Sequence, residues 1–600
     1  MSPLRLTLLA APLALAVGCL LPSFETLDEP PGSGGSGGTS GSGGSTGGTD
    51  EGGAPSQGGE HNAGGQGGEG GTNTAPVVED DVYVLVQGNE LSRIASQGVL
   101  SNDSGEELTV TDLTPSPSGA PSSYAPEFEI EPDGSFSFVP VPEFFGAFRA
   151  TYEVSDSAGN TAEGQVTIYV QPREADVAAL ADGVGGFCVD AAGADGVGSA
   201  IAGVGDGDGD GYDDFAIGAP NANSDAGRLY VVRGAPAGES FALEALTPES
   251  DEARYFVIDG EAGSNLGAAV SGAGDMNDDG LPDFVAGAPG ANSADGIVYA
   301  IRGLGSPPAQ VSAGEADALE FSGANADAAS KVLAGGFDLD GDGIPDPVVV
   351  VDFASSTYKG RYYAVSGASE LSDSLSDVAL GHVDGATAND YFTQAVASVG
   401  DVTGDGDNDL VLVSDSVLAV VKGPIGAFPA DLGASFAEGT DGFKLARNTG
   451  SNASVAGAGD IDGDGENDVL FCNGLQNCKV VFGPVEDLIA GLLVEGFAGT
   501  TLLTAVADLT GDAASEALFS DGETVYVVFG GSLEKDGSFD ITDLPNADGF
   551  IVSGAGGPIE SLAPVGDVNG DGHQDLAFGV PTAPGTDARV CVMYGTPKAP

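Results

Sequence analysis

Aspartates recur at a fixed spacing in the second half of the chain, in a nine-residue pattern that suits an oxygen-coordinated metal ion. The first copy reads D-G-D-G-D-G-Y-D-D, with Asp206, Asp208, Asp210 and Asp214 at positions 1, 3, 5 and 9. Their side-chain oxygens, with the backbone carbonyl of Tyr212 at position 7, can surround one hard cation. Glycine at position 6 permits the sharp turn that points the first three carboxylates inward. An oxygen-only ligand set favours calcium over zinc or copper.

The pattern occurs seven times, and six copies are intact. The fourth copy offers only the hydroxyl of Thr403 at position 3, so we expect weaker binding there. The copy from Asp508 to Glu516 has Ala513 instead of glycine, and we expect no metal in it. We therefore predict about six structural calcium ions. The candidate ligands after the first copy are Asp275, Asn277, Asp279, Leu281 and Asp283, then Asp338, Asp340, Asp342, Ile344 and Asp346, then Asp401, Thr403, Asp405, Asp407 and Asp409, then Asp460, Asp462, Asp464, Glu466 and Asp468, and last Asp567, Asn569, Asp571, His573 and Asp575.

An EF-hand shares the first positions of this pattern, but it also needs a glutamate at position 12 and flanking helices. Each copy here leads instead into a short apolar run that predicts a β-strand. Solvated acidic turns would explain a single copy of the pattern, but not six copies that all occur at the same position of a repeat. The residues at position 12 are Ile217, Ala286, Val349, Leu412, Phe471, Phe519 and Phe578.

The loops belong to a repeat that begins near residue 183. In the first unit, strand-like runs cover Ala200–Val204, Phe215–Gly218, Leu229–Val232 and Tyr255–Ile258. Four strands per unit is the content of one β-propeller blade. We predict an all-β fold, with a seven-bladed β-propeller over residues 183–600.

These units resemble the FG-GAP repeats of the integrin α-subunit propeller and its bacterial relatives. Gly218-Ala219-Pro220 and Gly287-Ala288-Pro289 match one half of the motif, and Gly579-Val580-Pro581 matches it in part. Val197-Gly198 and Leu266-Gly267 retain the other half. The resemblance implies calcium loops on one face of the propeller and a ligand-binding surface on the other.

Residues 75–173 contain alternating β-branched and aromatic runs that predict a small β-sandwich. The segment resembles the cadherin-like, Ig-like repeats of large bacterial surface proteins. The matching pieces include 98–103 (GVLSND), 133–140 (DGSFSFVP) and 152–156 (YEVSD).

The first residues predict export. Arg5 and the apolar run from Leu6 to Val17 are typical of a signal peptide over residues 1–18. The end of this run, LAVGC, resembles the lipobox of bacterial lipoproteins, which implies acylation of Cys19; ordinary signal-peptidase cleavage is the alternative. Residues 19–74 then form a Gly/Ser-rich disordered tether. We expect a lipid anchor in the outer membrane or cell surface of a bacterium, with membrane contact through the lipid alone.

The other four cysteines predict two disulfides in an oxidising compartment, with four free thiols as the alternative. Cys472 and Cys478 flank a predicted hairpin turn, so they should face each other. Residues 186–190 look like the fourth strand of a blade, whereas the last unit lacks one. Closing the ring with this strand places Cys188 beside Cys591.

The chain has 91 acidic and 18 basic residues, a net charge of −73. Nucleic acid binding needs a basic surface, so it is excluded as a partner. Hydrophobic residues make up 41% of the chain, which argues against a disordered acidic polymer.

No catalytic constellation emerges from the sequence. The three histidines are His61 in the tether, His382 in what we expect to be a solvated turn, and His573 in a metal loop. We expect a monomeric, calcium-stabilised binding or adhesion lipoprotein for an unknown extracellular protein or carbohydrate ligand. An extracellular hydrolase or lyase acting on polysaccharide through propeller carboxylates is one alternative, and a purely structural envelope spacer is another.

Overall fold

The structure is a computed structural model. It describes residues 75–599 apart from 116–121, 192–194, 237–239, 244–253, 304, 306–309, 314–317, 324–332, 352–359, 368–372, 387–394, 415–416, 425–428, 447–452, 473–476, 487, 489–490, 498–502, 532, 534–536, 545–547 and 581–587. The predicted signal peptide, Cys19 and the tether lie outside these residues.

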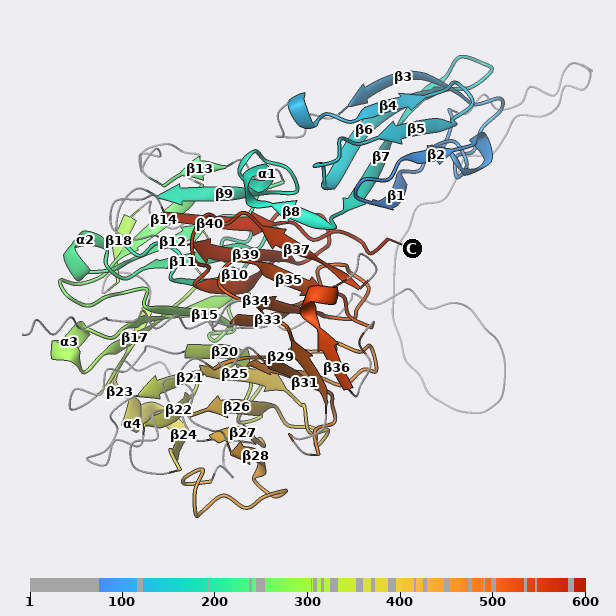
Figure 1. The fold of residues 1–600 in the computed structure, drawn as a ribbon. Helices are drawn as coiled ribbons and strands as arrows, with labels where there is room; N and C mark the ends of the chain where they lie inside the picture. The colour runs from blue at the N-terminus through green and yellow to red at the C-terminus, as the bar shows by residue number, and fades with distance from the viewer. Residues whose placement is uncertain are drawn as a thin grey trace, which may run out of the picture.

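Two sheets form the N-terminal domain, which is drawn in blue to cyan in Figure 1. Its strands alternate between buried and half-buried residues, as in β6, because one face of each strand contacts the core. Phe136, Phe138, Phe148 and Tyr152 are buried there. One sheet has the order β1 (Asp81–Val86), β7 (Thr161–Gln171), β6 (Gly146–Ser155) and β3 (Thr109–Pro115), and the other has the order β2 (Leu91–Arg93), β5 (Phe136–Val139) and β4 (Glu127–Ile130).

From residue 174 onward, the described residues form seven sheets of four or five strands, here called sheets 1 to 7 in order along the chain. Sheet 1 contains β10 (Ala200–Gly205), β11 (Asp214–Ala219), β12 (Arg228–Val232), β14 (Tyr255–Asp259) and β18 (Gln310–Ser312). Sheet 2 contains β15 (Ala269–Gly274), β16 (Asp283–Ala288), β17 (Ile297–Ile301), β19 (Ala318–Ser322) and β23 (Asp373–Ser374). Sheet 3 contains β20 (Leu333–Phe337), β21 (Asp346–Val351), β22 (Arg361–Val365) and β24 (Ala379–Asp384).

The remaining sheets follow the same plan. Sheet 4 contains β25 (Ala395–Gly400), β26 (Asp409–Val413), β27 (Val417–Val421) and β28 (Gly442–Ala446). Sheet 5 contains β29 (Ser454–Gly459), β30 (Asp468–Cys472), β31 (Cys478–Val481), β32 (Leu492–Glu495) and β36 (Gly537–Asp540). Sheet 6 contains β33 (Leu503–Ala507), β34 (Glu516–Ser520), β35 (Val525–Val528), β37 (Gly549–Ser553) and β8 (Glu174–Asp176). Sheet 7 contains β38 (Ser561–Gly566), β39 (Asp575–Val580), β40 (Ala588–Met593), β9 (Gly186–Ala191) and β13 (Phe241–Ala242).

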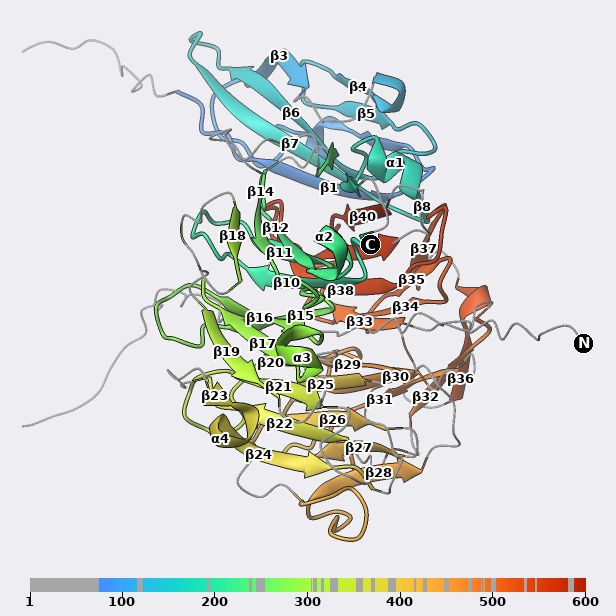
Figure 2. The same cartoon turned by 90° about the vertical axis from the view of Figure 1, so that its left-hand side faces the viewer.

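The sheets pack face to face, which explains why their inner strands are apolar along their whole length. All six residues of β10, β11, β15 and β16 are buried. The first strands of successive sheets contact each other in the order β10, β15, β20, β25, β29, β33 and β38, and β38 contacts β10. Figure 2 shows this circuit: sheets 1 to 3 lie on the left, sheet 4 lies at the bottom, and sheets 5 and 6 lie on the right.

Both ends of the repeat region contribute to sheet 7. Strand β9 pairs with β40 in antiparallel register, with Cys188 opposite Cys591, and the two cysteines form a disulfide. Cys472 and Cys478 form a second disulfide across β30 and β31. Both predicted disulfides are confirmed, as is the pairing of the early strand with the last unit.

An outer parallel strand was not predicted. In five sheets, a segment that precedes the fourth strand of one sheet pairs in parallel with the fourth strand of the preceding sheet. These segments are β18, β23, β36, β8 and β13. A parallel bridge between Asp384 and Asp431 occupies the same place between sheets 3 and 4. Each segment therefore links two successive sheets by backbone hydrogen bonds.

The α-helices are short. They are α1 (Val177–Ala181), α2 (Ala222–Asp225), α3 (Ala291–Ala294) and α4 (Leu375–Val378). Among the described residues, none is long and apolar enough to cross a membrane. In Figure 1, α2, α3 and α4 lie along the left side of the seven sheets, and the N-terminal domain lies at the upper right.

Candidate metal centres

Each of the predicted loops connects the first and second strands of its sheet, and we number the loops 1 to 7 accordingly. In loop 1, Asp206 Oδ1 accepts the N–H of Asp210 at 2.9 Å, and Asp206 Oδ2 accepts the N–H of Gly211 at 2.8 Å. The five other intact loops have the same two bonds from their position-1 aspartate. The position-1 carboxylate therefore fixes the turn through the backbone.

The glycine at position 6 has the role that the sequence predicted. Its φ lies between 89° and 96° in the six intact loops, a left-handed conformation that disfavours side chains. Position 12 lies inside the second strand of every sheet, as expected for a loop that is not an EF-hand.

Side-chain oxygens converge in three loops, where one ligand atom from each residue lies within 4.8 Å of the others. Asp208 Oδ1 in loop 1 is also buried without a hydrogen-bond partner. Oxygen donors at this spacing fit a single calcium ion. The converging sets are Asp206, Asp208 and Asp210, then Asp338, Asp340 and Asp346, and finally Asp460, Asp462 and Asp464.

The aspartate at position 9 has a second role that sequence reasoning missed. In loop 2, Asp283 is fully buried; its Oδ1 accepts the N–H of Gly303 at 2.7 Å and its Oδ2 accepts the N–H of Met276 at 2.9 Å. The same pair of acceptor bonds recurs in loops 3, 4, 5 and 7. This carboxylate joins its loop to the end of the third strand, whether or not it also binds a metal.

A sequence signal for this role exists in the glycine that follows each third strand by two residues. A Cβ at these glycines would lie 2.0–2.9 Å from the carbonyl oxygen of loop position 8, so only glycine fits there. The glycines are Gly234, Gly303, Gly367, Gly423, Gly483, Gly530 and Gly595.

Burial makes these carboxyls difficult to ionise. It raises the pKa of Asp214 to about 8 and that of Asp346 and Asp468 to about 7. Burial also raises the pKa of Asp283 and Asp409 to about 6. The neighbouring loop carboxylates add repulsion, and a bound divalent cation would offset both effects.

Loop 6, the diverged copy, keeps the turn by other means. Ala513 has a φ of 72°, close to that of the glycine it replaces. Glu516 is buried at position 9, where its Oε2 accepts the N–H of Leu509 at 2.6 Å and its Oε1 accepts the hydroxyl of Thr510 at 3.1 Å. The two substituted polar residues bind each other, which gives a physical reason for the expectation that this loop takes no metal.

Basic side chains among the described residues contact carboxylates of loops 1, 4 and 7. Arg233 Nε lies 3.3 Å from Asp208 Oδ2 in loop 1. Lys422 Nζ lies 3.2 Å from Asp405 Oδ2 in loop 4. At loop 7, Asp571 is reached from the N-terminal domain by Arg149.

His382 was predicted to lie in a solvated turn; the turn was wrong, but the exposure to solvent is confirmed. His382 lies in β24, exposed, with its ring centroid 5.9 Å from that of Tyr363. Partial desolvation of the ring and the positive charge of the nearby Arg361 lower the pKa of His382. Backbone pairing between β22 and β24, with Tyr363 opposite His382, holds it on a strand. The other described histidine, His573, belongs to loop 7.

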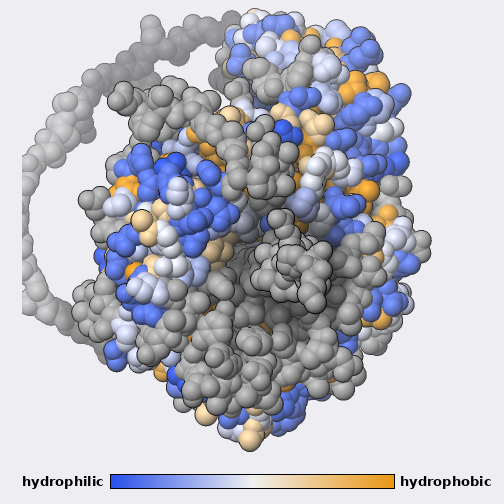
Figure 3. Space-filling model, turned by 60° about the vertical axis from the view of Figure 1, so that its left-hand side comes forward, coloured by the Kyte–Doolittle hydropathy of each residue, from blue (hydrophilic) through white to orange (hydrophobic). Residues whose placement is uncertain are grey.

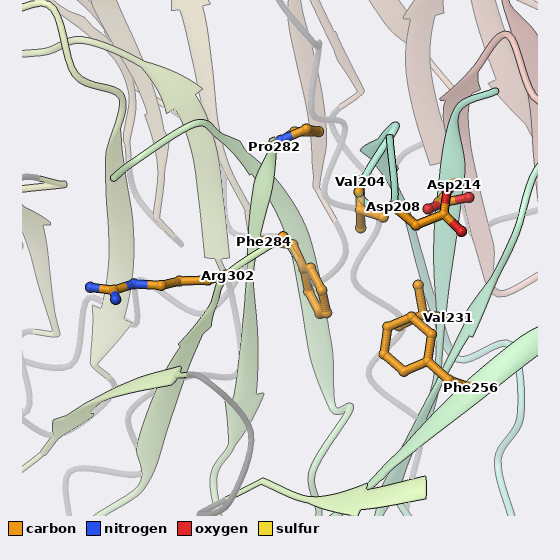
Figure 4. Close-up of a pocket in the computed structure, with 10 residues that line it drawn as sticks. Val204, Asp208, Asp214, Val231, Phe256, Pro282, Phe284 and Arg302 are labelled. Atoms are coloured by element: carbon orange, nitrogen blue, oxygen red, sulfur yellow. The ribbon is translucent and has the colours of Figure 1, made fainter. Parts of the chain in front are cut away.

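A small cavity lies beneath loop 1, between sheets 1 and 2. Its volume is about 10 Å³, room for one water molecule. Figure 4 shows the Asp208 and Asp214 carboxylates together at one end, while Arg302 points away. A cavity of this size is too small for an organic substrate.

The fold and its loops define a class, namely an all-β repeat protein with one acidic loop per repeat. Comparison with protein families agrees: residues 73–169 match the bacterial Ig domain, and residues 197–232 and 560–590 match the FG-GAP repeat. The chain therefore carries a bacterial Ig domain and FG-GAP repeats, as its resemblances predicted. No curated protein matches the chain.

Proposed function

We propose that this chain is a calcium-stabilised bacterial surface lipoprotein whose seven-bladed β-propeller binds an extracellular protein or carbohydrate. Its FG-GAP repeats and Ig-like domain are typical of non-enzymatic, extracellular adhesion proteins. The observation that carries the proposal is the shared geometry of the six intact loops.

The cyclic contacts support a closed propeller. Each sheet packs on the next through its first strand, and sheet 7 packs on sheet 1. Because β9 comes from the beginning of the repeat region and β40 from its end, their pairing joins the ends of the ring. The Cys188–Cys591 disulfide fastens this joint covalently.

Calcium has a structural role in this proposal. The side-chain oxygens and the position-7 carbonyl would hold each ion, and the ion would supply positive charge among carboxylates that otherwise repel each other. The buried position-9 carboxyls would then ionise within the folded chain.

The two faces of the propeller have different surroundings, which supports a ligand surface opposite the loops. The Ig-like domain contacts loop 7, where the Tyr169 and His573 ring centroids are 5.7 Å apart. The side that carries α2, α3 and α4 faces away from this contact (Figure 1). Figure 3 shows that side, on which the coloured residues are mainly hydrophilic and hydrophobic ones are scattered among them. A polar surface suits a polar ligand.

The lipid anchor completes the proposal. Acylation of Cys19 would place the tether between the membrane and the Ig-like domain, so that the loop side faces the cell. Metabolic labelling with a radioactive fatty acid tests this step. Label on the wild-type chain and none on the Cys19→Ser variant is the expected result; equal labelling of both would refute it.

The central test is thermal unfolding of the full chain with calcium or with chelator, together with analysis of bound metal. A rise in the unfolding temperature with about six ions per chain is expected. An unchanged unfolding temperature with no bound metal would contradict the calcium part of the proposal.

A further inference from the structure

The Ig-like domain reaches directly into loop 7. Arg149 of β6 places its Nη2 3.9 Å from Asp571 Oδ2, at position 5 of the loop. The Arg149 side chain is 37% exposed and that of Asp571 only 5%. Tyr169 of β7 meets the ring of His573 edge to face, at an interplanar angle of 86°. Two residues of one domain therefore cover two positions of a metal loop in the other.

Close packing holds this arrangement in place. A Cβ at Gly146 would lie 2.6 Å from the Cα of Gly185, and one at Gly185 would lie 2.4 Å from the Phe145 ring. The N–H of Ala599 donates to Gln171 Oε1 at 3.0 Å. The two glycines allow the backbone of the Ig-like domain to contact the backbone of the repeat region directly. The Ig-like domain is therefore docked, and this docking places Arg149 at loop 7.

Loops 1 and 4 have a similar basic neighbour, but they obtain it from their own sheets. Arg233 and Lys422 each directly precede the glycine that follows the third strand. The corresponding residue in sheet 7 is Tyr594, which carries no positive charge. In sheet 7 the charge comes from the Ig-like domain instead.

Arg149 and a bound cation would require the same oxygen. Asp571 Oδ1 accepts the N–H of His573 at 3.2 Å, the position-5 bond that the other intact loops also have. That bond leaves Oδ2 for a metal ion, and Oδ2 is the atom that Arg149 contacts. A guanidinium and a divalent cation on one carboxylate oxygen repel each other.

We propose that Arg149 is a built-in counter-ion of loop 7, so that calcium binding there and the Arg149–Asp571 ion pair oppose each other. This inference rests on the proposed calcium function of the loops. Loop 7 then binds calcium more weakly than it would without the Ig-like domain. By thermodynamic linkage, calcium weakens the ion pair by the same factor. The calcium concentration therefore affects the strength of the contact between the two domains.

The test is calorimetric titration of the full chain with calcium, in wild type and in Arg149→Gln. The same titration is repeated with Asp571→Asn added to each of the two chains. The difference between the titrations with and without Asp571→Asn gives the contribution of loop 7. Removal of one charge near a partly exposed site should tighten that contribution about five-fold. Arg149→Lys, which keeps the charge, should resemble the wild type. Arg93→Gln, which removes a positive charge elsewhere in the same domain, should leave all affinities unchanged.

The outcomes separate the two proposals. A tighter loop-7 site in Arg149→Gln, absent when Asp571→Asn is also present, supports the counter-ion role. Calcium binding with unchanged or weaker affinity in Arg149→Gln overturns that role and leaves the calcium proposal intact. Failure of the wild-type chain to bind calcium at all overturns the calcium proposal itself.

Discussion

Cys188 and Cys591 lie directly opposite each other in β9 and β40, although 403 residues separate them in sequence. Their disulfide encloses nearly the whole repeat region. The Cys472–Cys478 disulfide, by contrast, spans a separation of only six residues. The two bonds therefore restrict the unfolded chain to very different extents.

Removal of the long-range disulfide should destabilise the chain much more than removal of the short one. In the chain-entropy description, the loss grows with the logarithm of the enclosed loop length, so we expect about 6 kcal/mol for Cys188→Ser/Cys591→Ser and about 2 kcal/mol for Cys472→Ser/Cys478→Ser. Denaturant midpoints of the two double variants against wild type measure the difference. Equal shifts would show that the ring holds without its covalent joint.

Substitution at position 9 of loop 2 should destabilise the fold with or without calcium. Asp283→Asn replaces one acceptor oxygen by an amide group, so either the Gly303 or the Met276 N–H loses its buried partner, at about 2 kcal/mol. The matched control is Asp279→Asn at exposed position 5 of the same loop, which should matter only when calcium is present. Unfolding in the presence of chelator distinguishes the two variants. If Asp283→Asn is as stable as wild type under that condition, position 9 has no structural role.

Loop 6 should become a metal site when its three changed positions are restored. The variant Thr510→Asp/Ala513→Gly/Glu516→Asp recreates the D-x-D-x-D-G-x-x-D pattern and removes the Thr510–Glu516 hydrogen bond. Native mass spectrometry should then find one more calcium ion per chain than in wild type. Ala513→Gly alone relieves the left-handed alanine, by about 1 kcal/mol, without adding an ion. An unchanged ion count in the triple variant would contradict this account of loop 6.

Asp81 should make the Ig-like domain less stable as the pH rises. Burial raises its folded-state pKa to about 6, from 3.8. The folded chain therefore retains a proton that the unfolded chain loses between these values, and this contribution to stability, complete below pH 3.8, is lost as the pH rises through 6. Asp81→Asn removes the ionisation but keeps an oxygen for the Tyr152 hydroxyl, which donates to Asp81 Oδ2 at 2.8 Å. Its advantage over wild type should appear near pH 7 and vanish near pH 4; a constant difference across that range would exclude the titration.

Local patterns in the sequence were sufficient to predict much of the fold. The strands around each loop, the positive φ at position 6 and the Cys188–Cys591 pairing all follow from residue type and repeat phase. Each of these features is decided within one unit or by analogy between units. Comparison between the repeat units predicted that residues 186–190 form the fourth strand of the last unit.

Contacts between units and between domains were beyond prediction. Strand β13 has two residues and β8 has three, too few to show a periodicity, and their partners lie in other sheets. His382 resembled a turn residue because glycine precedes it, yet pairing with Tyr363 holds it on a strand. Asp283 matched a ligand pattern and its backbone role depends on a glycine 20 residues later. Arg149 had no local signal, because its partner is 422 positions away (571 − 149).

The short connection between the domains determines where a mechanical load would go. Strand β7 of the Ig-like domain ends at Gln171 and β8 of sheet 6 begins at Glu174. A pull on the Ig-like domain would therefore load β8 along its length, in shear against the parallel strand β37. If β8 yielded, the next resisting point along the chain would be the Cys188–Cys591 bond. Unravelling of the chain from the N-terminal side would stop at that bond, because it joins β9 covalently to β40 and leaves sheets 1 to 5 folded.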